Sequence, residues 1–448
     1  MKYLNTNFYF CFCSDLSDNE ITSIHYNSDT TKDNVSLLEV LGSNLRTINL
    51  QGNRIAAIED NTFALNPNLN SLTLTRNRLT SISGSAFTEV GRLTSLFLRE
   101  NLLNHLSVDA FKELPNLTTL DLTSNGFTEL PSAITKLARL EKLYISKNKI
   151  EEIPPSILQK CPELREFEVS GNLLKTIHPN AFIHLAKLEE LVISEARDVK
   201  ALPNLNGTLA LKLLRFDRAS IENIPADLCH HCPNLKSLEL KSNKIKAIPD
   251  LNGCKELRML DLTRNQITSL LEAHPNEKTS ENTNKSSTAL RGLSKLHDLH
   301  LGYNNISAIG VDIFKHLVSL KVLDLSHNQI NEIHDEAFAG LGQLEDLNLG
   351  VNTFSQFPSK GLKNLLHIKV QNNPALQEFP NSVRFPKIQS LVLSYAYHCC
   401  QFIPETYANF IPEYTDFENL EVRSLKLLYV VLRHIIGCHK TQQSMCCS

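Results

Sequence analysis

Four residues with metal-binding side chains stand together at Cys229, His230, His231 and Cys232. Thiolates and imidazoles bind structural zinc, but such sites use ligands at a set spacing, and no further ligand pair follows closely here. The sequence also contains no H-E-x-x-H motif, no G-x-S-x-G motif and no glycine-rich phosphate loop. We therefore expect a protein that is not an enzyme, with no bound metal and no cofactor.

The elements that position these side chains follow from an internal repeat. Twelve segments match L-x-x-L-x-L-x-x-N-x-L when Ile, Val and Phe count as apolar, and partial matches bring the total to about 15–16. Their asparagines are Asn53, Asn77, Asn101, Asn125, Asn148, Asn172, Asn243, Asn265, Asn304, Asn328, Asn352 and Asn373. Two further segments carry Ala196 and Ala219 at the asparagine position. The substitutions are either drift of the repeat sequence, with a local loss of order, or a sign that the curvature of the repeat stack changes there.

This pattern resembles the leucine-rich repeat, and it predicts an α/β repeat fold. Alternating apolar residues form one short strand per turn, and the strands stack in parallel into a solenoid, or horseshoe, with a concave sheet. Each asparagine amide is expected to satisfy backbone groups of its turn. Six phenylalanines lie ten residues after their asparagines and are expected to stack on the convex side: Phe63, Phe87, Phe111, Phe182, Phe314 and Phe338.

The side chains two, four and six residues after each leading leucine are expected on the concave face. From Leu45 to Leu365, ten acidic residues stand there against five Lys and Arg residues, which is either an ordinary solvated surface or a site for a basic protein partner. The residues predicted to contact a ligand are Phe97, Arg99, Asp121, Tyr144, Glu166, Glu168, Glu190, Arg215, Glu239 and Asp261.

Repeat position also explains several of the eleven cysteines. Cys229 and Cys254 lie ten and eleven residues after the asparagine positions of adjacent turns, within reach of a disulfide. Such a bond would close a loop of about 25 residues and stabilise the fold by roughly 3 kcal/mol. Cys161 and Cys232 lie three turns apart, and we expect both to be buried thiols.

Composition narrows the partners and the location. The net charge of −3 gives no positive field that would attract nucleic acid. The sequence contains no run of eighteen apolar residues, so it predicts no transmembrane helix. The first residues are too short an apolar stretch for a signal peptide. Five N-x-S/T sequons weakly favour a secreted glycoprotein: Asn34, Asn116, Asn206, Asn284 and Asn305.

The region 40–402 resembles the ectodomains of leucine-rich-repeat-containing G-protein-coupled receptors. The shared features are N-L-N-G-T at 204–208, the turn with Ala for Asn, the L-C…C-P-N-L step at 228–235, and Y-x-C-C-x-F at 397–402. The resemblance implies that Cys399 and Cys400 form disulfides with cysteines further along the chain. The number of turns is similar to the long-array branch, which includes the R-spondin receptors and the insect bursicon receptor.

The resemblance implies three segments and a function. Residues 1–40 are a flank with a partial first repeat, 41–402 are the solenoid with a polar insert at 272–290, and 403–448 are a divergent hinge-like or disordered tail. The function implied is that of a cell-surface or extracellular ectodomain that binds a secreted, basic, cystine-rich hormone, cystine-knot-like or R-spondin-like, on the concave face.

Signalling through a G protein needs seven membrane helices, which the residues after Phe402 do not match; we expect a truncated gene model or a soluble form. Two other functions remain open. A secreted or matrix scaffold with an adhesion role is one alternative, and a cytosolic adaptor is the other.

Overall fold

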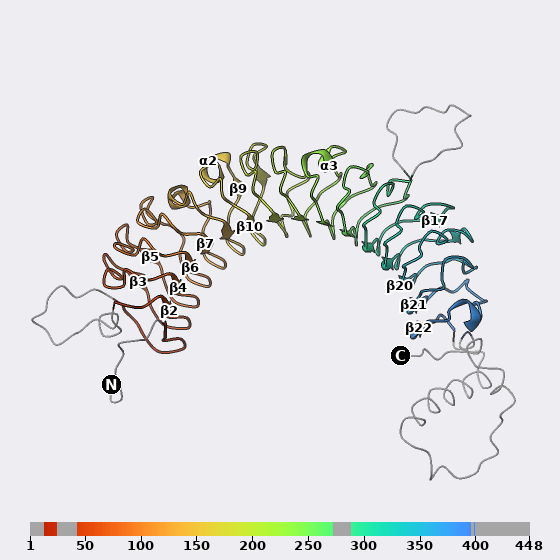
Figure 1. Cartoon of the computed structure of the whole chain (residues 1–448), viewed down its shortest axis with the longest axis horizontal. Coiled ribbons are helices and arrows are strands. Elements are labelled where there is room, and N and C mark those ends of the chain that lie inside the picture. Colours follow the sequence, from red (N-terminus) through yellow and green to blue (C-terminus); the bar gives the residue numbers. More distant parts are fainter. Residues whose placement is uncertain (1–12, 25–42, 272–287, 396–397, 399–448) are drawn as a thin grey trace, which may run out of the picture. The chain divides into compact units, whose positions relative to one another are not determined.

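The computed structural model divides the chain into two compact units, Met1–Leu240 and Lys241–Ser448, and each is described by itself. The residues that the structure describes are 13–24, 43–271, 288–395 and 398. Figure 1 shows that within each unit the short strands line the concave side of a curved stack of turns. The tail 403–448 lies outside the described residues, as do Cys399 and Cys400.

In the first unit, ten parallel strands form a sheet with one strand per turn. The strands, in sheet order, are β1 (Cys13–Asp15), β2 (Thr47–Asn49), β4 (Ser71–Thr73), β6 (Ser95–Phe97), β7 (Thr119–Asp121), β8 (Lys142–Tyr144), β10 (Glu166–Glu168), β12 (Glu190–Val192), β13 (Leu213–Arg215) and β14 (Ser237–Glu239). The presence of β1 shows that the N-terminal flank contributes a strand to the stack.

In the second unit, the same arrangement is built from six parallel strands. They are β15 (Met259–Asp261), β16 (Asp298–His300), β18 (Val322–Asp324), β20 (Asp346–Asn348), β21 (His367–Lys369) and β22 (Ser390–Val392). The fold predicted from the repeat, a solenoid with one short parallel strand per turn, is confirmed in both units.

Outside these sheets, the turns are mostly irregular and carry only short elements. Three pairs of two-residue strands lie there: β3 (Ala57–Ile58) with β5 (Ser81–Ile82), β9 (Glu152–Ile153) with β11 (Thr176–Ile177), and β17 (Ala308–Ile309) with β19 (Glu332–Ile333). The helical turns are η1 (Ser132–Lys136), α2 (Pro155–Leu158), α3 (Leu228–His231) and η2 (Ser382–Arg384). Within the described residues, the α component of this repeat fold is therefore limited to short helical turns.

The core is a stack of leucines that recur at the template positions. In the turn of β4, Leu69, Leu72, Leu74 and Leu79 are all fully buried. Burying one such side chain favours folding by about 1.5–3 kcal/mol relative to leaving it in water. Because strand side chains alternate between faces, the residues on either side of a buried strand leucine must point out of the concave face.

The expected phenylalanine stack is present on the other side of this core. All six predicted phenylalanines are at most 1% exposed. The rings of Phe63 and Phe87 stack at 5.9 Å between centroids, and Phe111 continues the column 6.3 Å from Phe87. In the second unit, Phe314 and Phe338 stack at 5.9 Å. These rings fill the width of the turns and compensate for the absence of tryptophan.

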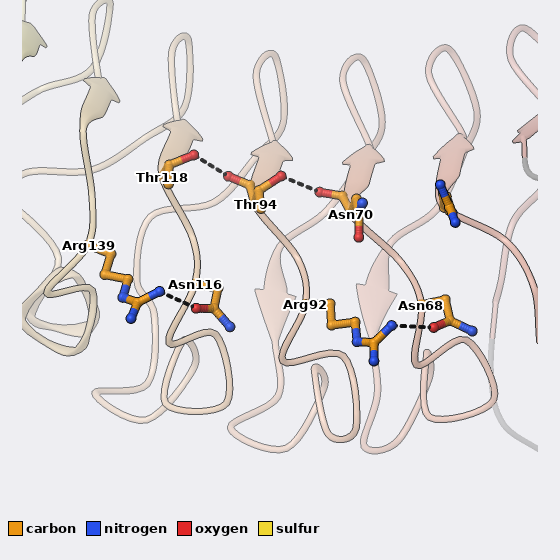
Figure 2. Close-up of a pocket in the computed structure, with 8 residues that line it drawn as sticks. Asn68, Asn70, Arg92, Thr94, Asn116, Thr118 and Arg139 are labelled. Carbon is orange, nitrogen blue, oxygen red and sulfur yellow. Dashed lines mark hydrogen bonds between the residues drawn. The ribbon is translucent and has the colours of Figure 1, made fainter.

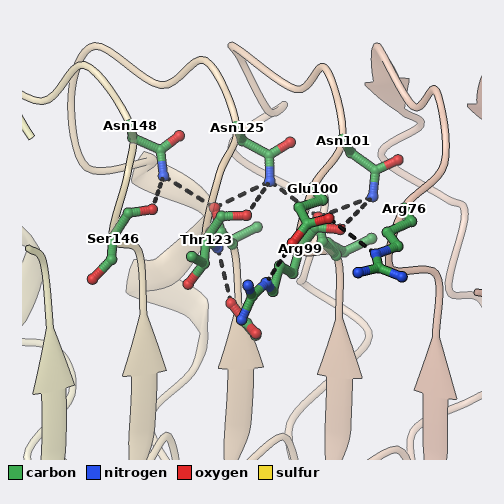
Figure 3. Close-up of polar contacts among 11 residues, drawn as sticks. Arg76, Arg99, Glu100, Asn101, Thr123, Asn125, Ser146 and Asn148 are labelled. Atoms are coloured by element: carbon green, nitrogen blue, oxygen red, sulfur yellow. Dashed lines mark hydrogen bonds and ion pairs between the residues drawn. The ribbon is translucent and has the colours of Figure 1, made fainter. Parts of the chain in front are cut away.

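Template asparagines link neighbouring turns through backbone groups, as predicted (Figure 3). Asn101 donates from Nδ2 to the carbonyl oxygens of Leu74 at 2.9 Å and Leu98 at 3.0 Å, and its Oδ1 accepts from the Leu79 amide at 3.0 Å. The residue before it, Glu100, has φ of +56°, so the amide network holds the chain in a left-handed turn that L-residues otherwise avoid.

At the two alanine turns the sheet continues. The buried Ala196 closes its turn through the Val199 amide, which donates to the Ala196 carbonyl at 3.0 Å. Strand β12 pairs in register with both β10 and β13, and β13 pairs with β14. The missing asparagines are therefore accommodated without a break in strand pairing.

The polar insert is shorter than the sequence indicated. Residues 272–287 lie outside the described part, but Thr288, Ala289 and Leu290 are buried, and Thr288 forms an antiparallel bridge with Leu271. The prediction that the insert extends to residue 290 is wrong, because Ala289 and Leu290 occupy the apolar positions before the next leading leucine, Leu296.

Candidate functional site on the concave face of the first unit

The candidate site consists of the outward side chains of strands β8, β10, β12, β13 and β14. The alternation within a strand positions them: in β10, Phe167 is 1% exposed and points into the core, while Glu166 and Glu168 on either side are only partly buried. Parallel, in-register pairing then aligns equivalent positions of successive turns in columns. Residues about 24 positions apart in the sequence therefore become direct neighbours.

Glu166 is neutralised by its neighbours on β8. Lys142 lies opposite in the register and places its Nζ 2.7 Å from Glu166 Oε1, while the Tyr144 hydroxyl donates to Glu166 Oε2. Burial acts to raise the pKa of Glu166, but the Lys142 and Tyr144 hydrogen bonds outweigh it and lower the pKa. Burial and the adjacent carboxylate raise the pKa of Tyr144, so this phenol stays protonated and donates.

Glu168 and Glu190 carry negative charge that no ion pair within the described residues neutralises. Glu168 accepts a hydrogen bond from the Ser146 hydroxyl at 2.9 Å, a neutral partner. Glu190 is exposed and lies opposite Glu166 in the register of β10 and β12. Lys142 offsets the charge of Glu166, so the two carboxylates without an ion pair in the described residues, Glu168 and Glu190, are the ones available to a cation from a partner.

Arg215 and Glu239, both predicted ligand contacts, pair with each other. Arg215 Nε lies 2.5 Å from Glu239 Oε2 and 3.8 Å from Asp217 Oδ2, and Ser237 donates to the other Glu239 oxygen at 2.9 Å. The hydrogen bond that Arg215 donates to Glu239 raises the pKa of Arg215. This pair therefore contributes shape and hydrogen-bonding atoms rather than net charge.

Two apolar side chains next to the acidic residues were missed from the sequence. Val192 and Leu213 point out of the same face, are half-buried, and lie diagonally across neighbouring strands β12 and β13. Both could have been recognised in the sequence, because an aliphatic residue stands there at an outward strand position that is mostly polar in the preceding turns. Together with Tyr144, they give the acidic surface an apolar component.

The predicted residues nearest the N-terminus form a separate cluster (Figure 3). Arg99 Nε lies 3.0 Å from Glu100 Oε1, and Arg76 Nε lies 3.1 Å from the other oxygen of Glu100. Arg99 and Arg76 lower the pKa of Glu100. Phe97 is half-buried beside this cluster, and Asp121 accepts from the Thr123 amide at 2.9 Å.

The structure thus arranges the predicted residues of the first unit as a stripe rather than one pocket. From Phe97 on β6 to Glu239 on β14 there are six strand spacings, or about 29 Å at ~4.8 Å each. This length suits a protein partner better than a small molecule. Asp261 belongs to β15 in the second unit, where it accepts from the Thr263 amide at 2.9 Å.

The cysteines of the C-H-H-C string have other roles than metal binding. Cys229, on α3, is disulfide-bonded, as is Cys254. Cys232 is a free thiol that lies fully buried, 3.6 Å from the Thr208 hydroxyl. Burial raises the pKa of Cys232 to about 11 and that of Cys161 to about 12. Both thiols are therefore protonated at neutral pH, and neither is a ready metal ligand.

Three of the five sequon asparagines fall within the described residues. Asn206 and Asn305 are exposed, and Asn116 is half-buried. Asn34 and Asn284 lie outside the described residues. In the part of the chain that the structure describes, no helix has the length and apolar character needed to cross a bilayer.

Comparison with known proteins identifies the family. The leucine rich repeat family model matches residues 43–103, 67–127, 91–150, 138–195, 210–267 and 294–354, which together cover more than half of the chain. Among solved structures, a leucine-rich repeat protein of Leptospira interrogans aligns with a TM-score of 0.59 at 24% identity, over 78% of this chain and 79% of that chain. The Toll–Spätzle complex of Drosophila aligns with a TM-score of 0.59 at 21% identity, over 74% and 48%. At these identities, the two structures show only that the fold is shared.

The sequence relatives are receptors. Leucine-rich repeat-containing G-protein coupled receptor 6 of Homo sapiens is 33% identical over 274 residues, 61% of this chain and 24% of the relative. Receptor 4 of Homo sapiens is 33% identical over 299 residues, 66% and 27%, and receptor 5 of Xenopus tropicalis is 31% identical over 274 residues, 61% and 26%. The chain thus spans about a quarter of the length of these relatives. It belongs to the leucine-rich repeat family, and its repeats are related to the ectodomain of leucine-rich-repeat-containing G-protein-coupled receptors.

Proposed function

We propose that this chain is an extracellular, ligand-binding leucine-rich-repeat ectodomain that binds a basic, secreted, cystine-rich protein without catalysing a reaction. The proposed site is the concave face of strands β8 to β14 in the first unit. Relationship to leucine-rich-repeat-containing G-protein-coupled receptors supports the receptor role and the cell-surface location. In such a receptor, coupling to a G protein would be the task of a membrane domain.

The observation that carries this proposal is the unneutralised charge of Glu168 and Glu190. Other carboxylates of the face, Glu166 and Glu239, are paired with Lys142 and Arg215. Glu168 and Glu190 have no such ion pair within the described residues. A complementary charge on a ligand would pair with them and speed its association.

The apolar side chains support a protein as the ligand. Half-buried aliphatic and aromatic residues surrounded by polar groups are typical of protein interfaces, where buried anchors contribute most of the affinity. Tyr144, Val192 and Leu213 provide such anchors within the acidic stripe. A cystine-rich ligand is proposed because the resemblance to the long-array branch implies one.

The first test replaces Glu190 with Gln and measures both stability and binding. Glu190 is exposed and forms no ion pair within the described residues, so Glu190→Gln should change the free energy of unfolding by less than about 0.5 kcal/mol. Affinity for the ligand should fall about fivefold to tenfold, which corresponds to about 1–1.4 kcal/mol. Biolayer interferometry with purified R-spondin and purified bursicon as probes gives the affinity, and urea titration gives the stability.

Glu129→Gln is the matched control, since Glu129 is an exposed carboxylate of the same unit away from the concave strands. It should leave the affinity unchanged. Equal affinities of Glu190→Gln and the unmodified chain would move the site elsewhere. If neither probe bound the unmodified chain at micromolar concentration, the assignment to a cystine-rich ligand of these two kinds would be wrong.

A further inference from the structure

A second surface of the first unit carries a row of arginines on one edge of the solenoid, beside the concave strands (Figure 2). Arg46 directly follows the leading leucine of its turn, and Arg92 and Arg139 directly precede theirs. The three belong to the turns of β2, β6 and β8 and line one hollow of about 560 Å³ together with Asn68, Asn70, Thr94, Asn116 and Thr118.

Arg92 and Arg139 are held in place without being neutralised. Arg92 donates to Asn68 Oδ1 at 2.8 Å, and Arg139 donates to Asn116 Oδ1 at 2.8 Å, so each guanidinium is oriented by a neutral amide. Neither arginine forms an ion pair with any carboxylate in the described residues. A guanidinium has five N–H donors, so most of the donors of both side chains stay available to a ligand.

The same edge is neutralised in the turns that follow. There Arg165 pairs with Glu189 at 2.7 Å and lies 3.8 Å from Glu141, and Lys187 pairs with Glu163 at 2.5 Å. Arg165 and Lys187 on this edge are thus each matched by a carboxylate on an adjacent turn. Arg92 and Arg139 have no such carboxylate within the described residues, and Glu141, two positions after Arg139, marks the end of the row.

The groups between the arginines are neutral and polar. The Thr94 hydroxyl donates to the Asn70 carbonyl at 3.0 Å, and the Thr118 hydroxyl donates to the Thr94 carbonyl at 3.1 Å. Because both hydroxyl hydrogens are used, these oxygens present acceptor lone pairs to hydroxyl groups of a ligand. None of the residues that line the hollow is aromatic or aliphatic, so it lacks the apolar anchors of a protein interface.

We propose that this edge binds a sulfated polysaccharide chain that lies across the turns. Successive guanidinium groups stand two turns apart, about 9–10 Å at ~4.8 Å per strand, so their spacing suits a linear polymer with regularly placed anions. Arginine binds such tetrahedral oxyanions with two parallel hydrogen bonds. The asparagine and threonine side chains match the sugar hydroxyls. A single narrow row fits a chain better than the broad face that a membrane surface requires.

The test measures binding of a fully sulfated heparin dodecasaccharide to the whole chain at 0.15 M NaCl. The double variant Arg92→Gln/Arg139→Gln should bind at least tenfold more weakly than the unmodified chain. The decline of affinity with salt should also become less steep, because fewer counterions are released when fewer charges meet the polyanion. A desulfated dodecasaccharide should bind neither protein.

Arg78→Gln/Lys149→Gln is the control, because both residues are exposed and directly follow their template asparagines, away from this edge. Like the test variant, it removes two positive charges, but it should change the affinity for the dodecasaccharide less than twofold. Equal losses in the two double variants would mean general charge attraction and would overturn the site. The proposal would also be overturned if the unmodified chain bound a single-stranded DNA of equal charge more tightly than it bound the dodecasaccharide.

The sequon at Asn116 lies inside this row, so a glycan there would cover the arginines. The measurement is therefore repeated with Thr118→Ala, which removes the sequon and retains both arginines and the Asn116 amide. Failure of both the unmodified chain and Thr118→Ala to bind the sulfated dodecasaccharide at micromolar concentration would refute the proposal. This surface does not share residues with the concave-face site, so neither result depends on the proposed hormone.

Discussion

Replacing both Glu168 and Glu190 with lysine is expected to weaken binding of a basic protein ligand by at least 100-fold. The double change removes the two carboxylates that form no ion pair within the described residues and places positive charges on β10 and β12, the two strands that follow Lys142 on β8. A 100-fold loss corresponds to about 2.7 kcal/mol, which lies within the range for like charges placed in an interface. Biolayer interferometry at two salt concentrations measures the effect, which should be larger at low salt.

The matched control is Glu129→Lys/Glu222→Lys, which makes the same charge change at exposed positions of the same unit outside the concave strands. Its affinity should remain within about threefold of the unmodified chain, the small loss reflecting the long-range field. If the control lost as much affinity as Glu168→Lys/Glu190→Lys, net charge rather than the concave face would control binding.

Phe87→Ala is expected to cost about 3–5 kcal/mol of unfolding free energy, the usual range for removing a buried phenylalanine. Phe87 is 1% exposed and contacts the rings of both Phe63 and Phe111. Its loss opens a cavity in the middle of the column. In a repeat protein each turn is stabilised by its direct neighbours, so the damage should concentrate in the turns of β2, β4 and β6, which hydrogen exchange measures.

Phe87→Leu serves as its control, because leucine preserves much of the apolar volume and should cost less than half as much. Equal losses for alanine and leucine would show that ring stacking, and not cavity volume, determines the stability of this column. A loss below about 1 kcal/mol for Phe87→Ala would show that the turn relaxes around the gap.

The fold followed from the sequence because a repeat fixes the environment of each position many times over. The template asparagines, the leucines and the stacked phenylalanines each recur at one spacing, so a single turn defines the others. The end of the insert could not be predicted from its polar composition, because Ala289 and Leu290 within it already resume the apolar pattern of the next turn.

The concave face was predictable as a surface but not as a set of charges. Repeat position shows that Glu166 points outward, yet its neutralisation depends on the rotamers of Lys142 and Tyr144 on the adjacent turn. Val192 and Leu213 were not predicted as ligand contacts, because they are neither charged nor aromatic. The same limit applies to the edge arginines, which stand 46 to 47 residues apart in the sequence and become one row only through stacking.

The most direct test of the concave-face site is photo-cross-linking from Val192→p-benzoylphenylalanine, with Glu222→p-benzoylphenylalanine outside the concave strands as the reference. Each protein is illuminated with the probe ligand that binds the unmodified chain, and adducts are mapped by mass spectrometry. The proposed site predicts a strong ligand adduct from position 192 and none from position 222. An adduct from position 222 alone would contradict binding on the concave face.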